Sequence, residues 1–501
     1  MRKKKYNAIF GKYLLDSISI GMYNNPLMLF REYIQNSTDS IDELAKRFKA
    51  RKSQSKRAIE ISINGQNHSI TIKDYGVGVS IYQARHMLHN VGVSSKKQGI
   101  DRGFRGIGRL GGLGYCDTLR FVTKASGENK YSISTWDCKK LKHIIANNKS
   151  SIEARNAIEQ ITQLELHSYK KNIQDNFFIV EMLNVKSSRN ILLNVPAIKD
   201  YISQVAPVPF QVKNFSWSKT INSRLRLKVP KYSIYDIYVN GEQIYKPYKD
   251  TIIINKSLVD KIQNVDFIEF KHDEELLAIG WVANLALLGA ISKASGTDGL
   301  RLRSGNIMVD NKEILSTFFR EKRFNKYLLG EVHIINKLIL NSRRDDFEDS
   351  VYKENFFNSF AKEIGIPFSR KIREVSMQRS LARTTAAAKD IVKVAKRITR
   401  NGYLSQFQKE KITNNLVQIK NNSTHKTQAI DKLINKLNKS RYIFQDRDIE
   451  IPDNTYSFLE TMLDVIHKEC KNQEEAERIS NIIITKTKSM FARNETTKGA
   501  A

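Results

Sequence analysis

The chain has 501 residues, 41% of them hydrophobic, which is enough for two to four domains that each bury a core. Its formal net charge of +31 favours polyanionic partners, nucleic acid before a membrane surface, with a merely solubilising surface as the alternative. Three scattered cysteines exclude a disulfide framework or a zinc-binding spacing, and no apolar run reaches the roughly 18 residues of a membrane span. The basic N-terminus lacks the apolar core of a signal peptide, so we expect a cytoplasmic protein without membrane contact.

Composition divides the sequence into three regions, and we expect three domains, 1–195, 196–368 and 369–501. The first region mixes helical and strand patterns and holds most of the glycine-rich motifs. The second is rich in strands, and the third has a helical, basic pattern with few glycines. The predicted fold class is therefore α+β, with a helical C-terminal region.

A helix is predicted from Asn25, the cap, and Pro26, which suits the first helical position. Glu32, Asn36 and Asp39 follow at i, i+4 and i+7, so they share one face of this helix. A solvated polar stripe is one explanation. Because apolar residues mark the neighbouring surface as packed, an acid, an amide and an acid in this arrangement favour a binding or catalytic site.

A β-hairpin is predicted next, with a two-residue turn at Asn64 and Gly65 between alternating strands. The second strand ends at Asp74, which is followed by Gly76 and Gly78. A carboxylate at a strand end can accept a hydrogen bond from an exocyclic amine, and glycines leave room for a flat ligand. The pattern D-x-G-x-G is only moderately specific by itself.

The stretch DRGFRGIGRLGGLGYCD, residues 101–117, is rich in glycine. Glycines let a ligand approach the backbone, so bare N–H groups here could face a phosphate. A bulged strand or a tight loop explains the same residues.

Taken in order, these three motifs resemble those of the GHKL ATPases, which include gyrase, HtpG-like chaperones, histidine kinases and MutL, together with their MORC relatives. The motifs are E-x-x-x-N-x-x-D on a helix, D-x-G-x-G after a hairpin, and a glycine-rich run. MLHNVGVSSKK is similar to the start of the family's ATP lid, and GFRGIG shares the G-F-R-G of MutL-type proteins. The resemblance implies a Bergerat-type α/β sandwich in the N-terminal domain and favours the MORC, MutL and HtpG-like branch.

The resemblance also implies ATP as the ligand and Mg²⁺ as the cofactor. Glu32 would be the general base, and Asn36 would complete the Mg²⁺ shell. Asp74 would bind the adenine amine beside Gly76 and Gly78. The remaining cofactor-binding candidates are Asp39, Met87, Asn90, Lys97, Gly103, Phe104, Arg105, Gly106, Ile107 and Gly108.

Residues 92–108 would form a lid over the phosphates, with Lys96 as a catalytic candidate near the γ-phosphate. Arg102 and Arg105 would be secondary phosphate-binding candidates, with a solvated side chain as the alternative for either. The segment GFRGIG would be the hinge of this lid, and RLGGLGYCD would start a helix beneath the phosphates. One departure from the family is visible: many members carry a Gly-Thr pair on a later strand, and DNFFIVEML lacks it. The adenine contact from that strand is therefore unassigned.

The middle region resembles a transducer domain. LNSRRDDFED is similar to the L-N-x-S-R-E region of the chaperones' middle domain, which makes Arg344, with Arg343 beside it, the candidate for a basic residue that reaches the γ-phosphate. GLRLRSGNIMVDN is similar to a transducer strand of the MORC and chaperone-like branch. A structural ion pair with Asp345 or Asp346 is the alternative role for the arginine.

Basic residues outnumber acidic ones over 371–446, on helical patterns. This region could dimerise as a helical hairpin, face nucleic acid, or cap the transducer. Because no aromatic residues are interleaved with the basic ones, contacts to DNA would go to its backbone phosphates.

The sequence thus predicts an ATP-hydrolysing, Mg²⁺-dependent enzyme that works as an ATP-gated homodimer on DNA, as in repair or anti-phage defence. An HtpG-like chaperone is the first alternative. A scaffold or sensor subunit that works with a separate effector protein is the second, and a topoisomerase subunit with a separate cutting partner is the third.

Overall fold

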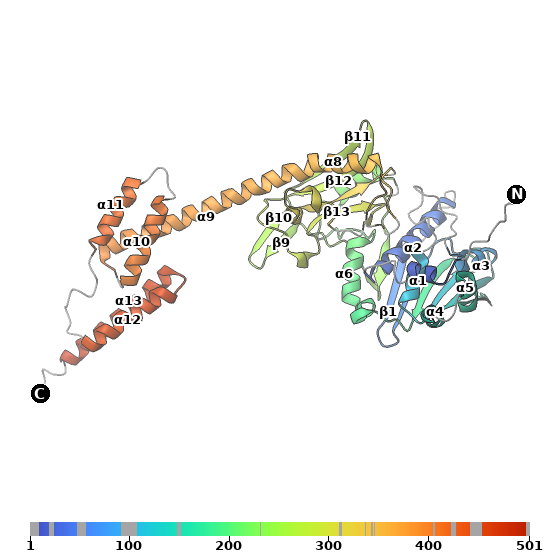
Figure 1. Cartoon of the computed structure of the whole chain (residues 1–501), viewed down its shortest axis with the longest axis horizontal. Coiled ribbons are helices and arrows are strands. Elements are labelled where there is room, and N and C mark those ends of the chain that lie inside the picture. The colour runs from blue at the N-terminus through green and yellow to red at the C-terminus, as the bar shows by residue number, and fades with distance from the viewer. Residues whose placement is uncertain are drawn as a thin grey trace, which may run out of the picture. The chain divides into compact units, whose positions relative to one another are not determined.

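The computed structural model describes residues 10–19, 25–47, 57–91, 108–147, 152–230, 232–309, 313–335, 337–341, 344, 346–403, 406–421, 427–440 and 453–496. The chain forms two compact units, Met1–Arg373 and Glu374–Ala501. The first combines two large sheets and a two-stranded ribbon with helices, and the second is helical, so the predicted α+β class is confirmed (Figure 1). Both sheets lie within the first unit, and the boundary at residue 195 stays a prediction.

The first sheet has eight strands in the order β5-β4-β3-β6-β2-β1-β7-β8. Neighbouring strands are antiparallel except β1 and β7, which are parallel. The strands are β1 (Ala58–Asn64), β2 (Ser69–Asp74), β3 (Thr118–Lys124), β4 (Lys130–Asp137), β5 (Thr162–Ser168), β6 (Phe177–Leu183), β7 (Asp236–Val239) and β8 (Glu242–Gln243).

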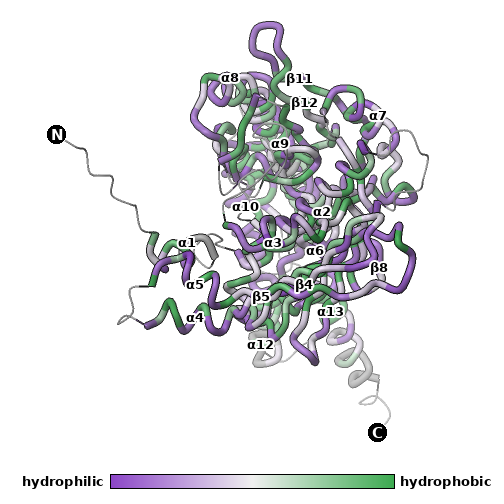
Figure 2. The backbone as a smooth tube through the Cα atoms, turned by 90° about the vertical axis from the view of Figure 1, so that its right-hand side faces the viewer, coloured by the Kyte–Doolittle hydropathy of each residue, from purple (hydrophilic) through white to green (hydrophobic). Residues whose placement is uncertain are grey.

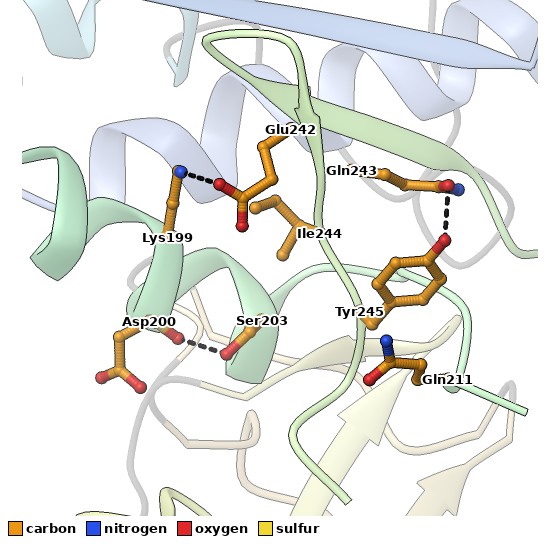
Figure 3. Close-up of a pocket in the computed structure, with 8 residues that line it drawn as sticks. All are labelled: Lys199, Asp200, Ser203, Gln211, Glu242, Gln243, Ile244 and Tyr245. Carbon is orange, nitrogen blue, oxygen red and sulfur yellow. Dashed lines mark hydrogen bonds and ion pairs between the residues drawn. The ribbon is translucent and has the colours of Figure 1, made fainter. Parts of the chain in front are cut away.

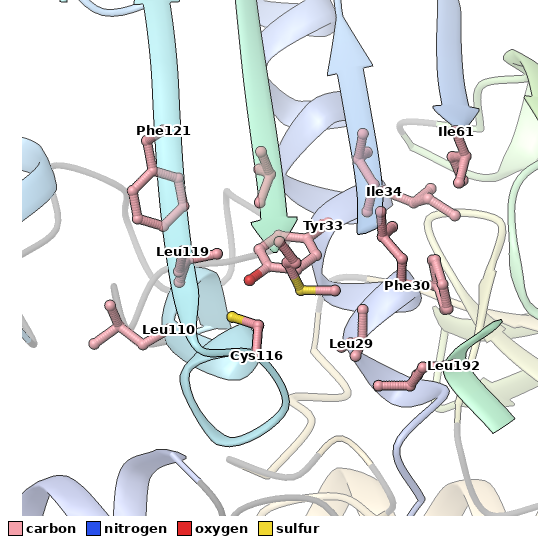
Figure 4. Packing of buried hydrophobic residues seen from close by; sticks show 14 of the residues in the cluster. Leu29, Phe30, Tyr33, Ile34, Ile61, Leu110, Cys116, Leu119, Phe121 and Leu192 are labelled. Carbon is pink, nitrogen blue, oxygen red and sulfur yellow. The ribbon is translucent and has the colours of Figure 1, made fainter. Parts of the chain in front are cut away.

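Helices cover one face of this sheet, because alternate strand residues are apolar and point to the same side. Figure 4 shows α2 side chains such as Phe30 and Ile34 packed against strand residues such as Ile61 and Leu119. The helices of this region are α1 (Tyr13–Ser19), α2 (Met28–Arg47), α3 (Ile81–His89), α4 (Cys138–Ala146), α5 (Ala154–Ile161) and α6 (Val195–Val205), with 3₁₀ helices η1 (Gly108–Gly114) and η2 (Ser188–Leu193).

Two local predictions are corrected. The hairpin turn has four residues, since Asn64 pairs with Ser69, and the Asn64 side chain accepts hydrogen bonds from the N–H groups of Gln66 and Asn67 (3.0 Å each). This side-chain turn replaces the expected two-residue turn. The helix α2 starts at Met28, because Asn25 caps a preceding turn by accepting from the Leu27 N–H (3.1 Å).

The second sheet has five strands in the order β11-β12-β15-β13-β14, with β13 and β15 parallel. Figure 2 shows the charged turn between β11 and β12 as hydrophilic. The strands are β11 (Asn264–His272), β12 (Glu275–Asn284), β13 (Gly299–Ser304), β14 (Ile307–Met308) and β15 (Leu329–Ile334), and β9 (Thr251–Asn255) and β10 (Leu258–Lys261) form a separate ribbon. The helices are α7 (Ser218–Lys228), α8 (Val351–Phe360) and the 3₁₀ turns η3 (Lys293–Ser295), η4 (Ser316–Phe318) and η5 (Lys322–Tyr327).

A π-helical turn η6 (Ala361–Gly365) joins α8 to α9 (Ile366–Asn401), and the division between the two units falls within α9. The second unit continues with α10 (Gln406–Asn421), α11 (Thr427–Asn438), α12 (Asp453–Glu469) and α13 (Gln473–Thr496). Its core includes Ile398, Leu416 and Leu463. The predicted helical C-terminal region is thus confirmed. Within the described ranges, no helix is both long and apolar enough to cross a membrane.

Candidate functional site

Glu32 lies buried on α2, with only 5% of its surface exposed. Two guanidinium groups approach the same carboxylate oxygen, Oε1. Arg31 Nη2 is 3.1 Å away, and Arg344 Nη1 is 3.7 Å away. A charge can be buried only where opposite charges and hydrogen bonds compensate it, so these arginines make the buried carboxylate possible.

Arg344 comes from far along the chain, in the loop that follows β15, and its side chain is 17% exposed. Its backbone has a φ of 58°, in the left-handed region that non-glycine residues seldom adopt, and its N–H donates to the Asn341 carbonyl (3.2 Å). Such a conformation costs on the order of 1 kcal/mol, so the surrounding structure determines the position of this arginine.

The 3₁₀ helix η1 lies beside the same carboxylate. A Cβ atom on Gly108 would come within 2.6 Å of Glu32 Oε2, so only glycine fits there without moving the acid. Tyr33 joins η1 to α2, since its hydroxyl donates to the Arg109 carbonyl (3.0 Å) and accepts from the Gly112 N–H (3.0 Å). Where the sequence predicted the start of a helix at RLGGLGYCD, the structure has this short 3₁₀ segment.

Arg109 ties η1 to the end of α3. Its Nη2 donates to the carbonyl of Asn90, which is the C-cap of α3. Burial lowers the pKa of the Arg109 guanidinium to about 10, still high enough for it to be charged at neutral pH. Asn90, a predicted cofactor-binding residue, thus marks the point where α3 meets η1, while Met87 lies on α3 with 39% of its surface exposed.

Asp74 ends β2 and is buried, and its Oδ1 accepts a hydrogen bond from the Gly76 N–H (2.9 Å). Gly78 has a φ of +65°, and a Cβ there would lie 2.0 Å from the Lys124 carbonyl oxygen. A Cβ on Gly76 would lie 2.1 Å from Ser40 Oγ. The two glycines are therefore required by close packing of the loop after β2.

This loop contacts α2 on the face that carries the other predicted ligands. The Val77 N–H donates to the Ser40 carbonyl (3.3 Å), and Ser40 directly follows Asp39. Asn36 and Asp39 are half-buried along the same helix, at i+4 and i+7 from Glu32. The structure thus brings the loop after β2 against the helix that carries the predicted base and metal ligand.

Asn176 was missed by sequence reasoning. Its Nδ2 donates to the Tyr75 carbonyl (3.0 Å) and to the Gly76 carbonyl, which holds the loop after β2 from the side of β6. Since Asp74 pairs with Phe178 across β2 and β6, Asn176 lies opposite Gly76. It belongs to the segment DNFFIVEML, where the expected Gly-Thr pair is absent. Only the pairing register of two distant strands could have revealed it.

Several predicted site residues lie outside the described residues: Lys96, Lys97, Arg102, Gly103, Phe104, Arg105, Gly106, Ile107 and Arg343. Among the described residues, no group of three or more His, Cys, Asp or Glu side chains could hold a metal ion. A single amide ligand, Asn36, fits Mg²⁺ because this ion keeps several waters and takes its other ligands from substrate phosphates.

A separate pocket of about 570 Å³ lies between α6 and the segment that follows β8 (Figure 3). Its polar side chains pair with one another, as Lys199 does with Glu242 and Tyr245 with Gln243 (2.6 Å). It contains none of the predicted site residues.

In comparisons with known proteins, the region of this chain that matches a protein family includes the candidate site. Residues 29–170 match the family model "Histidine kinase-, DNA gyrase B-, and HSP90-like ATPase". Chaperone protein HtpG of Clostridium perfringens is 27% identical over 218 residues, which cover 38% of this chain and 34% of that protein. HtpG of Wigglesworthia glossinidia brevipalpis is 24% identical over 269 residues, which cover 47% of this chain and 39% of that protein. The chain thus spans little more than a third of the length of these curated relatives.

Among solved structures, the ATPase region of Saccharomyces cerevisiae topoisomerase II is similar with a TM-score of 0.39 and 12% identity, over 70% of this chain and 85% of that one. The matched family region runs from the start of α2 through β5, and so includes Glu32, Asn36 and Asp74. Over residues 29–170 the chain is thus similar to the GHKL superfamily of ATPases.

Proposed function

We propose that the chain binds ATP and hydrolyses it, with Glu32 as the general base that orients and deprotonates the attacking water. The observation that supports this proposal most strongly is that Arg344 lies within 3.7 Å of the buried Glu32 carboxylate. A base and a cation delivered from a distant loop are the two groups that a phosphoryl-transfer site needs, one for the water and one for developing phosphate charge.

Nucleotide binding is assigned to the residues around the end of β2. The Asp74 carboxylate would accept the adenine amine, in a loop kept in place by Gly76, Gly78 and Asn176. Asn36 would hold Mg²⁺, which neutralises phosphate charge when it is bound. Arg344 would contact the γ-phosphate, which would draw it from Glu32 Oε1 and leave this oxygen to the water.

The test is calorimetric titration with ATP, together with turnover, in Glu32→Ala and Asp74→Asn. Glu32→Ala should bind ATP and lose hydrolysis, whereas Asp74→Asn should lose binding. Glu43→Ala is the matched control, since Glu43 lies on the same helix with a 45% exposed side chain. Normal ATP binding by Asp74→Asn would contradict the adenine assignment, and normal turnover by Glu32→Ala would contradict the assignment of the base.

We further propose that ATP gates a homodimer that acts on the DNA backbone. The observations that favour DNA are the net charge of +31 and the exposed face of α9. On this helix Lys389, Lys393, Lys396 and Arg400 recur at helical spacing, opposite the buried Ile398. DNA-stimulated ATP turnover across a salt series tests this role, and absence of DNA binding near physiological salt would contradict it.

A chaperone function is the second candidate, favoured by the similarity to HtpG over 218 residues. Suppression of client aggregation that depends on Glu32 and not on DNA would select it. A scaffold or sensor subunit with a separate effector protein makes a third pattern: Glu32→Ala would keep cellular activity, while Asp74→Asn would lose it.

A further inference from the structure

Glu331 on β15 lies at the centre of a fully buried group of charged and polar side chains. Lys246 Nζ is 2.8 Å from Glu331 Oε2, and Arg303 Nε is 2.6 Å from Oε1. The Tyr248 hydroxyl donates to Oε1 (3.1 Å), and His333 Nε2 is 3.2 Å from Oε2. The ion-paired side chains are 0% exposed, so their charges depend on ion pairs and hydrogen bonds within the protein.

The same group joins several segments of the first unit. Arg303, from β13, donates through Nη2 to the Gln204 carbonyl at the end of α6 (2.7 Å). Lys246 also donates to Asn306 Oδ1 (2.9 Å), and Asn306 Nδ2 donates to the Ser233 carbonyl (2.9 Å). Elements that flank the first sheet are thereby connected to the parallel strand pair of the second.

The two ends of this connection bear on the candidate site. Lys246 and Tyr248 follow closely after β8, the edge strand of the first sheet, which also holds Asp74 on β2. The chain that leaves β15, the strand of Glu331, continues into the loop of Arg344. The segment that follows β8 and strand β15 are thus joined at the Glu331 carboxylate.

Stability by itself is a weak reason for such a group. Apolar residues of similar volume often stabilise a core as well as a buried ion pair does, whereas an ion pair fixes geometry through directed hydrogen bonds. Both Glu331 oxygens accept from two or more donors, so β15 can neither slide nor rotate without breaking several contacts.

We propose that Glu331 is a positioning residue for ATP hydrolysis. Its carboxylate locks β15 to the segment that follows β8 and so fixes where Arg344 meets Glu32. This inference rests on the proposed function, because it assigns Glu331 an effect on turnover through Arg344.

The test is Glu331→Gln, which keeps the size of the side chain and removes its charge. Turnover (kcat) should fall at least tenfold, while KM and the ATP dissociation constant stay within about twofold, since β2, which carries Asp74, is separated from β8 by β1 and β7. In an Arg344→Ala background, Glu331→Gln should cause no further loss, because a positioning residue acts only through the group that it positions. Amide exchange should rise in peptides that follow β15 and stay unchanged in β3 and β6.

Two further variants control for misfolding. Tyr248→Phe removes a single donor to Glu331 and should lower kcat in the same direction by a smaller factor. Glu269→Gln, on β11 of the same sheet and paired with Lys228 (3.3 Å), should leave turnover unchanged.

Full turnover in folded Glu331→Gln, or an additive loss in the Arg344→Ala background, would overturn the inference. Unchanged turnover in Arg344→Ala alone would instead refute the role of this arginine in the proposed function. The exchange measurement remains decisive in that case, since unchanged exchange after β15 would show that Glu331 does not hold the loop.

Discussion

Two buried glutamates of the first unit are held by cations, and they differ in how their oxygens are used. Glu331 accepts from Arg303, Lys246, Tyr248 and His333, and these donors are spread over both oxygens. At Glu32 both arginines approach Oε1, while Oε2 lies beside Gly108, where no Cβ fits. Donors on both oxygens hold Glu331 in one orientation, as suits a residue that joins strands. At Glu32 the distinctive feature is the close approach of Gly108 to Oε2.

The largest expected effect is on turnover, which should depend on Glu32 as the proposed base. Glu32→Gln removes the base but keeps the shape of the side chain, so kcat should fall by about 10²–10⁴-fold. The affinity for ATP should change little, because the nucleotide contacts are assigned to the end of β2. Steady-state turnover and calorimetry measure the two quantities, and Glu43→Gln on the same helix is the control. A comparable loss in Glu43→Gln would mean that the effect comes from α2 as a whole.

The second prediction distinguishes the two glutamates by how much each stabilises the fold. Glu331→Ala leaves the buried Lys246 and Arg303 without their shared partner, and breaking such a group costs about 3–5 kcal/mol. Urea unfolding should report this loss in the transition of the first unit. Glu269→Ala should cost less, because the Glu269 side chain is 24% exposed and the side chain of its partner Lys228 is 41% exposed. Equal losses of stability in the two variants would show that the buried Glu331 group stabilises the fold no more than the partly exposed Glu269 ion pair.

Sequence reasoning found one of these acids and not the other. Glu32 and Asn36 follow from helical spacing, and Asp74 from its place at the end of a strand before two glycines; the strand and helix themselves are confirmed. Glu331 and Arg303 could not be found, because alternating charged residues in a strand normally indicate a solvent face. Their burial depends on the parallel pairing of β13 and β15, which no local pattern encodes.

The contact between Arg344 and Glu32 could be predicted from the sequence only in part. The resemblance named the arginine, but the residues that hold it depend on the tertiary fold, including the left-handed backbone at Arg344 itself. Asn176 was missed for the same reason, since its partners are carbonyls opposite it in the sheet rather than neighbours in sequence. Chemistry that depends on spacing within one element is readable from sequence, and chemistry that depends on register is not.

A smaller effect should appear in the pH dependence of stability. Burial lowers the pKa of His333 to about 4, despite the Glu331 carboxylate beside it. Between this value and the ordinary pKa of 6.5, the unfolded chain binds a proton that the folded chain does not. Protons therefore favour unfolding, and the free energy of unfolding should fall by up to about 3 kcal/mol as the pH drops through this window.

His333→Gln should flatten that part of the profile, which urea unfolding at a series of pH values measures. Among the described residues His333 Nδ1 is buried and has no hydrogen-bond partner, so a second proton on the ring would be uncompensated, and this is the physical origin of the effect. An unchanged slope between pH 6.5 and 4 in the variant would show that other groups cause the acid sensitivity.

The smallest effect concerns the glycine that distinguishes Glu32 from Glu331. In Gly108→Ala the new Cβ would come within 2.6 Å of Glu32 Oε2, a side-chain rather than a backbone atom, so the carboxylate should shift while the backbone stays in place. A displaced base lowers turnover, here by about tenfold, and the free energy of unfolding should change by less than about 1 kcal/mol. Gly65→Ala is the matched control, because no atom of the described part of the chain lies within 4 Å of its Cβ position. If Gly108→Ala kept full turnover, the space beside Oε2 would have no part in catalysis, and the two carboxylates would differ only in their ion pairs.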